Sequence, residues 1–219
     1  MNELRVGIID DDETKITQIY TLLLDGWNKA SPEKKAKYSE YRLTPIEMPV
    51  CPSIEDAIGL IQEERIECVL IDYRLTSYGN IKYTGVELTQ ELLRVKHGFP
   101  VFILTSYEDE IYAKELFDVY QIFDFDRYMN DSAERVELNT KIVEQVLKYR
   151  KELISWEREL LELLPRAGEN VSIDTRILQL DEYIENSIDG KHLIPAQVKN
   201  QLSRGKIDAL LEKLDKLLE

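Results

Sequence analysis

The chain has 219 residues, of which 43% are hydrophobic and 32% are charged, and its formal net charge at pH 7 is −14. This length allows one domain of ordinary size and a smaller one, and the apolar content is sufficient for a packed core. Because phosphate backbones and anionic lipids bind clustered lysine and arginine, the acidic balance argues against nucleic acid or a membrane surface as partners.

The sequence also indicates a cytoplasmic protein. Cys51 and Cys68 lack a metal-ligand spacing, and Cys68 falls inside an apolar run, which is typical of a buried, reduced thiol. No apolar run approaches the roughly 18 residues of a membrane span. The first apolar run turns acidic too soon to be a signal peptide.

The first 131 residues alternate between strand and helix patterns. Short apolar runs predict strands at about 4–10, 46–50, 67–72, 100–104 and within 122–129. Helical spacing predicts helices between them near 13–26, 53–64, 86–96 and 109–119, with residues 31–44 as an inserted loop or helix extension. The alternation predicts an α/β domain over 1–131, a flavodoxin-like, doubly wound, five-stranded parallel sheet.

From residue 132 the pattern is helical, which predicts an all-α C-terminal region over 132–219. A long helix is expected at 132–164, then helices at about 173–188, 195–203 and 206–218. Apolar residues spaced by four and three form a heptad seam, made of Ile142, Val146, Tyr149, Leu153, Trp156, Leu160 and Leu163. A homodimeric coiled coil through 132–164 and a bundle with the C-terminal helices both fit this seam, and both interpretations stay open.

Two of the predicted strands run directly into acidic residues. The first is followed by Asp10, Asp11 and Asp12, and the third ends in Asp72. In a parallel sheet the functional crevice lies outside the carboxyl ends of the strands, so these carboxylates are expected to converge. Converging carboxylates repel one another and need a cation, and Mg²⁺ prefers oxygen ligands.

These features resemble the receiver domain of two-component response regulators. Asp10 and Asp11 stand where that family keeps its acidic metal-binding pair. Asp72, in Leu70-Ile71-Asp72-Tyr73-Arg74-Leu75, is similar to the phosphorylated aspartate, and Thr105, in Phe102-Ile103-Leu104-Thr105-Ser106, to the switch threonine or serine.

The resemblance implies a definite chemistry. Asp72 would accept a phosphoryl group, with Mg²⁺ bound by Asp10, Asp11, Asp72 and the backbone carbonyl of Arg74. Thr105 would donate its hydroxyl to a phosphoryl oxygen. An aromatic residue of strand five, best matched by Tyr128, would follow inward and change the neighbouring surface.

The sequence departs from the receiver pattern in two places. The loop from Asp72 to Gly85 is longer than usual and contains Tyr78 and Tyr83. Receivers also end strand five with a lysine that contacts the phosphoryl group, whereas counting three residues on from Tyr128 gives Asp131. Loss of such a charge-assisted contact costs roughly 1.5–3 kcal/mol of coupling.

The leading functional interpretation is a cytoplasmic response regulator with no enzymatic activity beyond phosphoryl self-transfer and slow autodephosphorylation. A histidine kinase or a phosphotransfer protein of a phosphorelay would supply the phosphoryl group, and the helical region would bind a protein target that the sequence does not name. Residues 151–219 hold 10 basic and 14 acidic side chains, a net charge of −4, which disfavours direct contact with DNA.

Two alternatives stay open. The missing lysine fits a pseudo-receiver, a binding module that phosphorylation does not switch. Alternatively, Asp10-Asp11-Asp12-Glu13-Thr14 resembles the Asp-x-Asp-x-Thr motif of haloacid-dehalogenase-type phosphatases, with Asp10 as nucleophile and Leu104-Thr105-Ser106 as the second motif. The phosphatase interpretation leaves Asp72 without a role.

Overall fold

The computed structural model describes residues 2–75, 81–107, 121–187, 190, 193–195, 197–203 and 205. The chain divides into two compact units, Met1–Tyr149 and Arg150–Glu219. The division therefore falls inside the long helix and not at residue 131, where the strand and helix patterns stop alternating. The helices expected at 109–119 and 206–218 lie outside the described residues, as does Tyr78.

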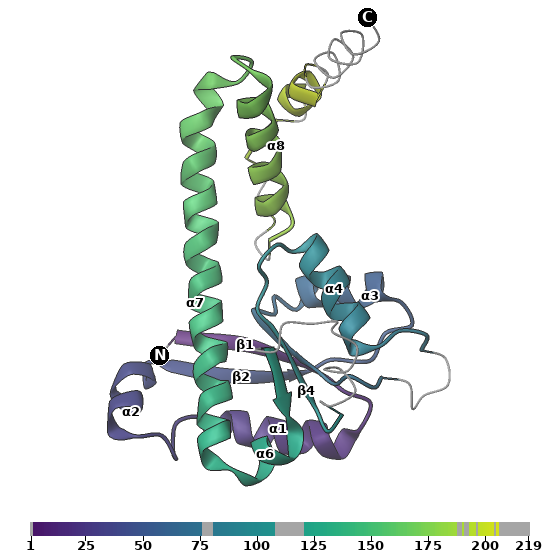
Figure 1. The fold of residues 1–219 in the computed structure, drawn as a ribbon, viewed down its shortest axis with the longest axis vertical. Helices are drawn as coiled ribbons and strands as arrows, with labels where there is room; N and C mark the ends of the chain where they lie inside the picture. The colour runs from purple at the N-terminus through teal and green to yellow at the C-terminus, as the bar shows by residue number, and fades with distance from the viewer. Residues whose placement is uncertain are drawn as a thin grey trace, which may run out of the picture. The chain divides into compact units, whose positions relative to one another are not determined.

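The first unit is built on five parallel strands in the order β2-β1-β3-β4-β5 (Figure 1). The strands are β1 (Asn2–Ile9), β2 (Tyr41–Glu47), β3 (Cys68–Ile71), β4 (Val101–Thr105) and β5 (Ile122–Asp124). This order is that of flavodoxin-like doubly wound sheets, so the predicted fold class is confirmed. In the register Ile9 pairs with Ile71, and Ile71 pairs with Ile103, which brings three strand ends to one edge.

The second strand begins earlier than the predicted 46–50. Asn2 pairs with Tyr41 at its start, and Pro45 lies opposite Val6 in the middle. Proline cannot donate a hydrogen bond to a neighbouring strand, so it is tolerated because β2 is an edge strand.

Helices cover both faces of the sheet. On one face α1 (Glu13–Asp25), α6 (Phe125–Asn130) and the first half of α7 (Ser132–Leu163) share one core with β1 and β4. On the other lie α3 (Ile54–Glu63) and α4 (Gly85–Val95), and Val86 packs against Ile103 (Figure 1). The core on the first face includes the α7 residues Leu138, Ile142, Val143 and Val146. At about 1.5–3 kcal/mol for each fully buried side chain, this packing fixes the first half of α7 to the α/β unit.

The polar insertion at 31–44 forms a separate short helix, α2 (Pro32–Tyr38). Ser31 caps it by accepting a hydrogen bond from the Lys34 N–H at 3.3 Å. The Tyr38 ring is buried against Trp27, with ring centroids 5.1 Å apart, and its hydroxyl donates to Glu144 of α7. This helix is therefore part of the packed unit.

The second unit contains the end of α7 and helix α8 (Val171–Glu185). Pro165, in the short 3₁₀ turn Leu164–Arg166, follows the end of α7. The buried core of this unit consists of Leu160, Ile177, Leu180, Ile184, Ile194 and Leu202. Residues 197–203 are helical. No helix in the described part of the chain combines the length and apolar character needed to cross a bilayer.

The heptad seam is largely used inside the chain. Ile142 and Val146 belong to the core of the first unit, and Leu160 belongs to the core of the second. Trp156 and Leu163 pack against that second core. This burial favours the bundle interpretation, whereas Ile154 and Leu161, which flank the seam, are 58% and 60% exposed.

Candidate metal and phosphoryl site

The first side of the site is the turn between β1 and α1. Asp10 is 4% exposed, and its Oδ1 accepts a hydrogen bond from the Asp12 N–H at 2.8 Å. Asp12 caps α1, because its Oδ1 accepts from the N–H groups of Thr14 at 2.8 Å and Lys15 at 3.3 Å. The phosphatase alternative pairs Asp10 with Asp12, but here the Asp12 carboxylate is engaged by the start of the helix.

The second side is the end of β3, where Asp72 is 3% exposed. Its N–H donates to the Ile9 carbonyl at 2.9 Å, which ties it to the neighbouring strand. The backbone of Gly85, the first residue of α4, lies against the Asp72 carbonyl group. A Cβ on Gly85 would lie 2.0 Å from the Asp72 carbonyl oxygen, so the backbone approaches as closely as it does only because residue 85 has no side chain.

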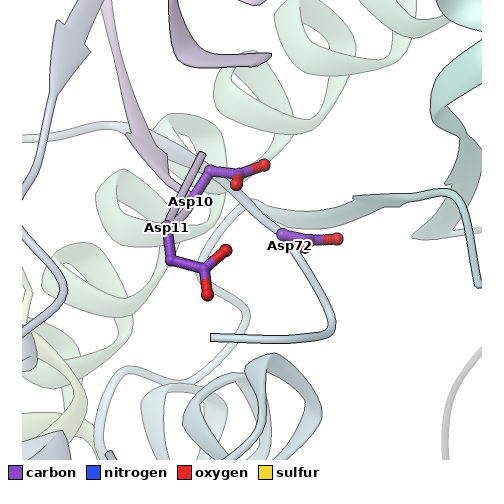
Figure 2. A group of neighbouring side chains, drawn as sticks. All are labelled: Asp10, Asp11 and Asp72. Carbon is purple, nitrogen blue, oxygen red and sulfur yellow. The ribbon is translucent and has the colours of Figure 1, made fainter. Parts of the chain in front are cut away.

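Asp10, Asp11 and Asp72 form one cluster. One carboxylate oxygen from each lies within 4.8 Å of the others, and Figure 2 shows the three side chains side by side. Within the described residues, no hydrogen-bond partner reaches Asp10 Oδ2 or Asp72 Oδ1, although both atoms are buried. Buried carboxylate oxygens without partners are costly, and a hard divalent cation with oxygen ligands matches this donor set.

Burial raises the pKa of both buried acids. The pKa of Asp10 is raised from 3.8 to about 7, first by burial and then by the negative charge of Asp72. The pKa of Asp72 is also raised, chiefly by burial. A bound cation would offset both effects, because it favours the ionised carboxylates.

Thr105 ends β4 with its side chain fully buried. A hydrogen bond between its side chain and the Asp72 carboxylate lowers the pKa of Asp72 and so opposes the effect of burial. Its Oγ1 also accepts from the Tyr107 N–H at 3.3 Å. The structure therefore brings together four side chains that the sequence selected, namely Asp10, Asp11, Asp72 and Thr105.

Strand five differs from the expectation. It ends at Asp124, whose carboxylate caps α6 by accepting from the Arg127 N–H at 2.6 Å. Tyr128 therefore lies in helix α6 and not in a strand, with its side chain fully buried. Asp131, counted from Tyr128, follows α6 and accepts from the Ala133 N–H at 2.7 Å. The residue that directly follows the strand is Phe125.

Two further residues that the sequence analysis named, Arg74 and Tyr83, lie in the long loop after β3. Arg74 is exposed, and its guanidinium lies 3.7 Å from the centre of the Tyr107 ring. Tyr83 is buried, and its hydroxyl donates to the Cys51 carbonyl at 2.7 Å. Tyr83 therefore anchors the loop before α4 to the chain that leads into α3.

Lys15 is a site residue that the sequence reasoning missed. Its Nζ lies 3.5 Å from Asp72 Oδ2, and its side chain is 19% exposed. The ammonium group also lies 5.3 Å from the centre of the Phe125 ring. The sequence feature that could have identified Lys15 is its place in the first turn of a helix capped by Asp12. That turn begins beside the acidic edge of the sheet.

The strand order and the acidic edge define a doubly wound α/β module with carboxylates at the ends of its strands. No protein-family model and no curated protein matches the sequence. Solved structures similar in fold include a two-component transcriptional regulator AraC from Clostridium phytofermentans, which is 17% identical with a TM-score of 0.45 and is matched over 67% of this chain and 98% of that one.

A second similar structure is a CheY-like response regulator receiver domain protein from Methanospirillum hungatei. It is 17% identical, with a TM-score of 0.41, over 69% of this chain and 99% of that one. A third is the signal receiver domain of a modulated diguanylate cyclase from Desulfovibrio desulfuricans, 18% identical with a TM-score of 0.41 over 68% and 97% of the chains. These are similarities in fold, and the chemistry of this chain rests on its own residues.

Proposed function

We propose that the chain is a response regulator whose first unit accepts a phosphoryl group on Asp72 in the presence of Mg²⁺. The observation that carries this proposal is the acidic cluster, in which three carboxylates from two strand ends lie within 4.8 Å. The unpartnered buried oxygens of Asp10 and Asp72 support it further. The metal would be held by these two residues, Asp11 and the backbone carbonyl of Arg74.

The proposed reaction is a simple displacement. An oxygen of the Asp72 carboxylate attacks the phosphorus of a phosphodonor, forming an acyl phosphate as the bond from phosphorus to the leaving group breaks. With acetyl phosphate the leaving group departs as acetate. The Thr105 hydroxyl donates to a phosphoryl oxygen, and a bound Mg²⁺ would supply positive charge against the repulsion between the two anions. In the cell the donor would be a histidine kinase or a phosphotransfer protein.

The helical second unit would transmit the phosphorylation state to a protein target. Tyr128 is the switch residue of this proposal. Its hydroxyl is buried, and no partner reaches it from the described residues. Tyr128 of α6 shares a core with the first half of α7. A change in the packing of this ring would therefore change the packing of α7.

The test is phosphorylation of the full chain by acetyl phosphate with Mg²⁺, read by intact-protein mass. Wild type should gain the mass of one phosphoryl group, and Asp72→Asn should gain none. Asp56→Asn, an exposed aspartate on α3, is the matched control and should be labelled as wild type is. Equal labelling of wild type and Asp72→Asn would contradict the proposal.

The pseudo-receiver is a second candidate, and one observation favours it. Lys15 is already paired with Asp72 at 3.5 Å, so the chain itself offsets part of the acidic charge. Titration with Mg²⁺ and beryllofluoride, followed by NMR, separates the candidates. A saturable response argues for the switched receiver, and its absence argues for the binding module.

A further inference from the structure

The proposed phosphorylated site carries more negative charge than one metal ion can balance. Asp10 and Asp11 contribute two charges, and a phosphoryl group on Asp72 adds about −1.5 to −2. Mg²⁺ supplies only two positive charges. Because Asp10 and Asp72 are buried at the end of the sheet, the excess is poorly solvated, and a second cation is needed beside the phosphoryl oxygens.

Strand five does not supply this cation. The sequence has no lysine from Ile122 to Thr140. Phe125 follows the strand directly, and two basic side chains further along the chain, those of Arg135 and Lys141, have other partners. Arg135 donates to the carbonyls of Tyr128 at 3.2 Å and Met129 at 2.7 Å. The Lys141 ammonium lies 4.8 Å from the centre of the Phe123 ring.

Lys15 supplies a cation from a different element. Its Nζ lies 3.5 Å from Asp72 Oδ2, the carboxylate that would carry the phosphoryl group. Two contacts hold it there. The Asp12 cap accepts from its backbone N–H at 3.3 Å, and the Phe125 ring lies 5.3 Å from its ammonium. Phe125 thus directly follows strand five, and its ring contacts the ammonium group of Lys15.

We propose that Lys15 is the phosphoryl-binding cation of this protein, reaching Asp72 from the first turn of α1. The inference rests on the proposed function of Asp72. In the unphosphorylated protein Lys15 pairs with the carboxylate, and after transfer its ammonium donates to oxygens of the phosphoryl group. Because it also repels a metal ion beside Asp72, Lys15 strengthens phosphoryl binding without strengthening Mg²⁺ binding.

The test compares wild type, Lys15→Gln and Lys15→Arg. Beryllofluoride serves as the phosphoryl mimic in saturating Mg²⁺, and Mg²⁺ affinity is measured separately without it, both by isothermal titration calorimetry. Lys34→Gln is the matched control, since Lys34 lies on α2 and pairs with Glu137 at 3.3 Å. Loss of one charge-assisted contact should weaken beryllofluoride binding by about tenfold or more in Lys15→Gln.

Mg²⁺ affinity of Lys15→Gln should be unchanged or higher, and Lys15→Arg should restore beryllofluoride binding. Wild-type affinity for beryllofluoride in Lys15→Gln would overturn the inference while leaving the proposed function intact. An equal loss of Mg²⁺ and beryllofluoride affinity would also overturn it, because Lys15 would then only hold the carboxylates in place. If wild type binds no beryllofluoride, the proposed function fails as well.

A second test uses wild type alone, so it does not depend on whether a variant folds. The side-chain ¹⁵N resonance of Lys15 should shift when beryllofluoride is added with Mg²⁺, because its partner changes from a carboxylate to the phosphoryl mimic. An unmoved resonance in a sample saturated with beryllofluoride would contradict the inference.

Discussion

Each unit of the chain buries aspartate, but the two units differ in how lysine pairs with the buried carboxylates. In the second unit Asp181 of α8 is 1% exposed and forms an ion pair with Lys199, which also pairs with Glu185. There, one lysine contacts both carboxylates. In the first unit three carboxylates converge, and Lys15 pairs with one of them at 3.5 Å.

The difference separates an ion pair that serves the fold from a cluster in which the carboxylates outnumber the lysine that pairs with them. The pair in the second unit joins α8 to the helical residues 197–203. The cluster in the first unit keeps an acid whose pKa is raised to about 7, which indicates that its ionised form is poorly stabilised without a ligand. A protein tolerates such a cost where the site has a function.

The largest effect is expected from a substitution that disturbs the backbone next to Asp72. Gly85→Ala places a Cβ 2.0 Å from the Asp72 carbonyl oxygen, so the start of α4 must move. We expect a loss of about 3 kcal/mol in the free energy of unfolding, measured by urea denaturation. Gly59→Ala is the control. Its Cβ would meet nothing within 4 Å, and alanine in a helix gains up to about 1 kcal/mol.

The second prediction concerns metal binding at the acidic cluster. Mg²⁺ at one hundred times its dissociation constant should stabilise wild type by about 2.7 kcal/mol, seen as a rise in the midpoint of thermal unfolding. Asp10→Asn removes one ligand and should abolish most of that rise. Lys199→Met, in the other unit, should leave it unchanged. A rise of equal size in Asp10→Asn would place the ion elsewhere.

The third prediction concerns the structural pair. Lys199→Met leaves the buried Asp181 without its cation, and we expect a loss of about 2 kcal/mol, since the lysine side chain is 25% exposed and part of the pair energy is screened. Hydrogen exchange of α8 peptides should accelerate. Exchange in β1 and β3 should not change. Unaltered exchange in α8 would mean that apolar packing alone holds this helix.

The smallest expected effect is the pH dependence of metal binding. Protons compete with Mg²⁺ at Asp10, whose pKa is raised to about 7 by burial and by Asp72 and Asp11, with an opposing effect from Lys15. Affinity measured by calorimetry should therefore be about tenfold lower at pH 6 than at pH 8. Asp10→Asn should flatten this profile, and a flat profile in wild type would contradict the assignment.

The same shift has a defined sign for the metal-free fold. The unfolded chain ionises Asp10 near 3.8, whereas the folded protein keeps the proton until about pH 7. This acid therefore contributes stability below pH 3.8 that is lost as the pH rises towards 7. The side chain introduced by Asp10→Asn stays neutral at every pH, so the free energy of unfolding of this variant should rise relative to that of wild type across that interval.

The sequence predicted the parts of the fold that depend on short, unambiguous patterns. Buried strands such as Cys68–Ile71 are continuous apolar runs, and parallel strands must end at a common edge. Asp10 and Asp72 could therefore be brought together without coordinates. Thr105 was selected through the resemblance to the switch residue of receiver domains, and the end of β4 puts it at the same edge.

The parts that failed depend on competing local signals. Tyr128 was expected in a strand, but the Asp124 cap starts a helix directly after three strand residues. Lys15 was missed because a lysine in a first helical turn is usually solvated, and only the tertiary position of α1 brings it to Asp72. The unit boundary depends on which core buries Ile142 and Val146, and a helical pattern alone does not decide that.

One contact gives the site a natural reporter. The Asp12 N–H donates to Asp10 Oδ1 at 2.8 Å, while the Asp12 side chain holds the first turn of α1. Any ligand that draws electron density from the Asp10 carboxylate will weaken that hydrogen bond. The amide resonance of Asp12 should then titrate with occupancy, so an NMR spectrum can count filled sites without any label attached to the protein.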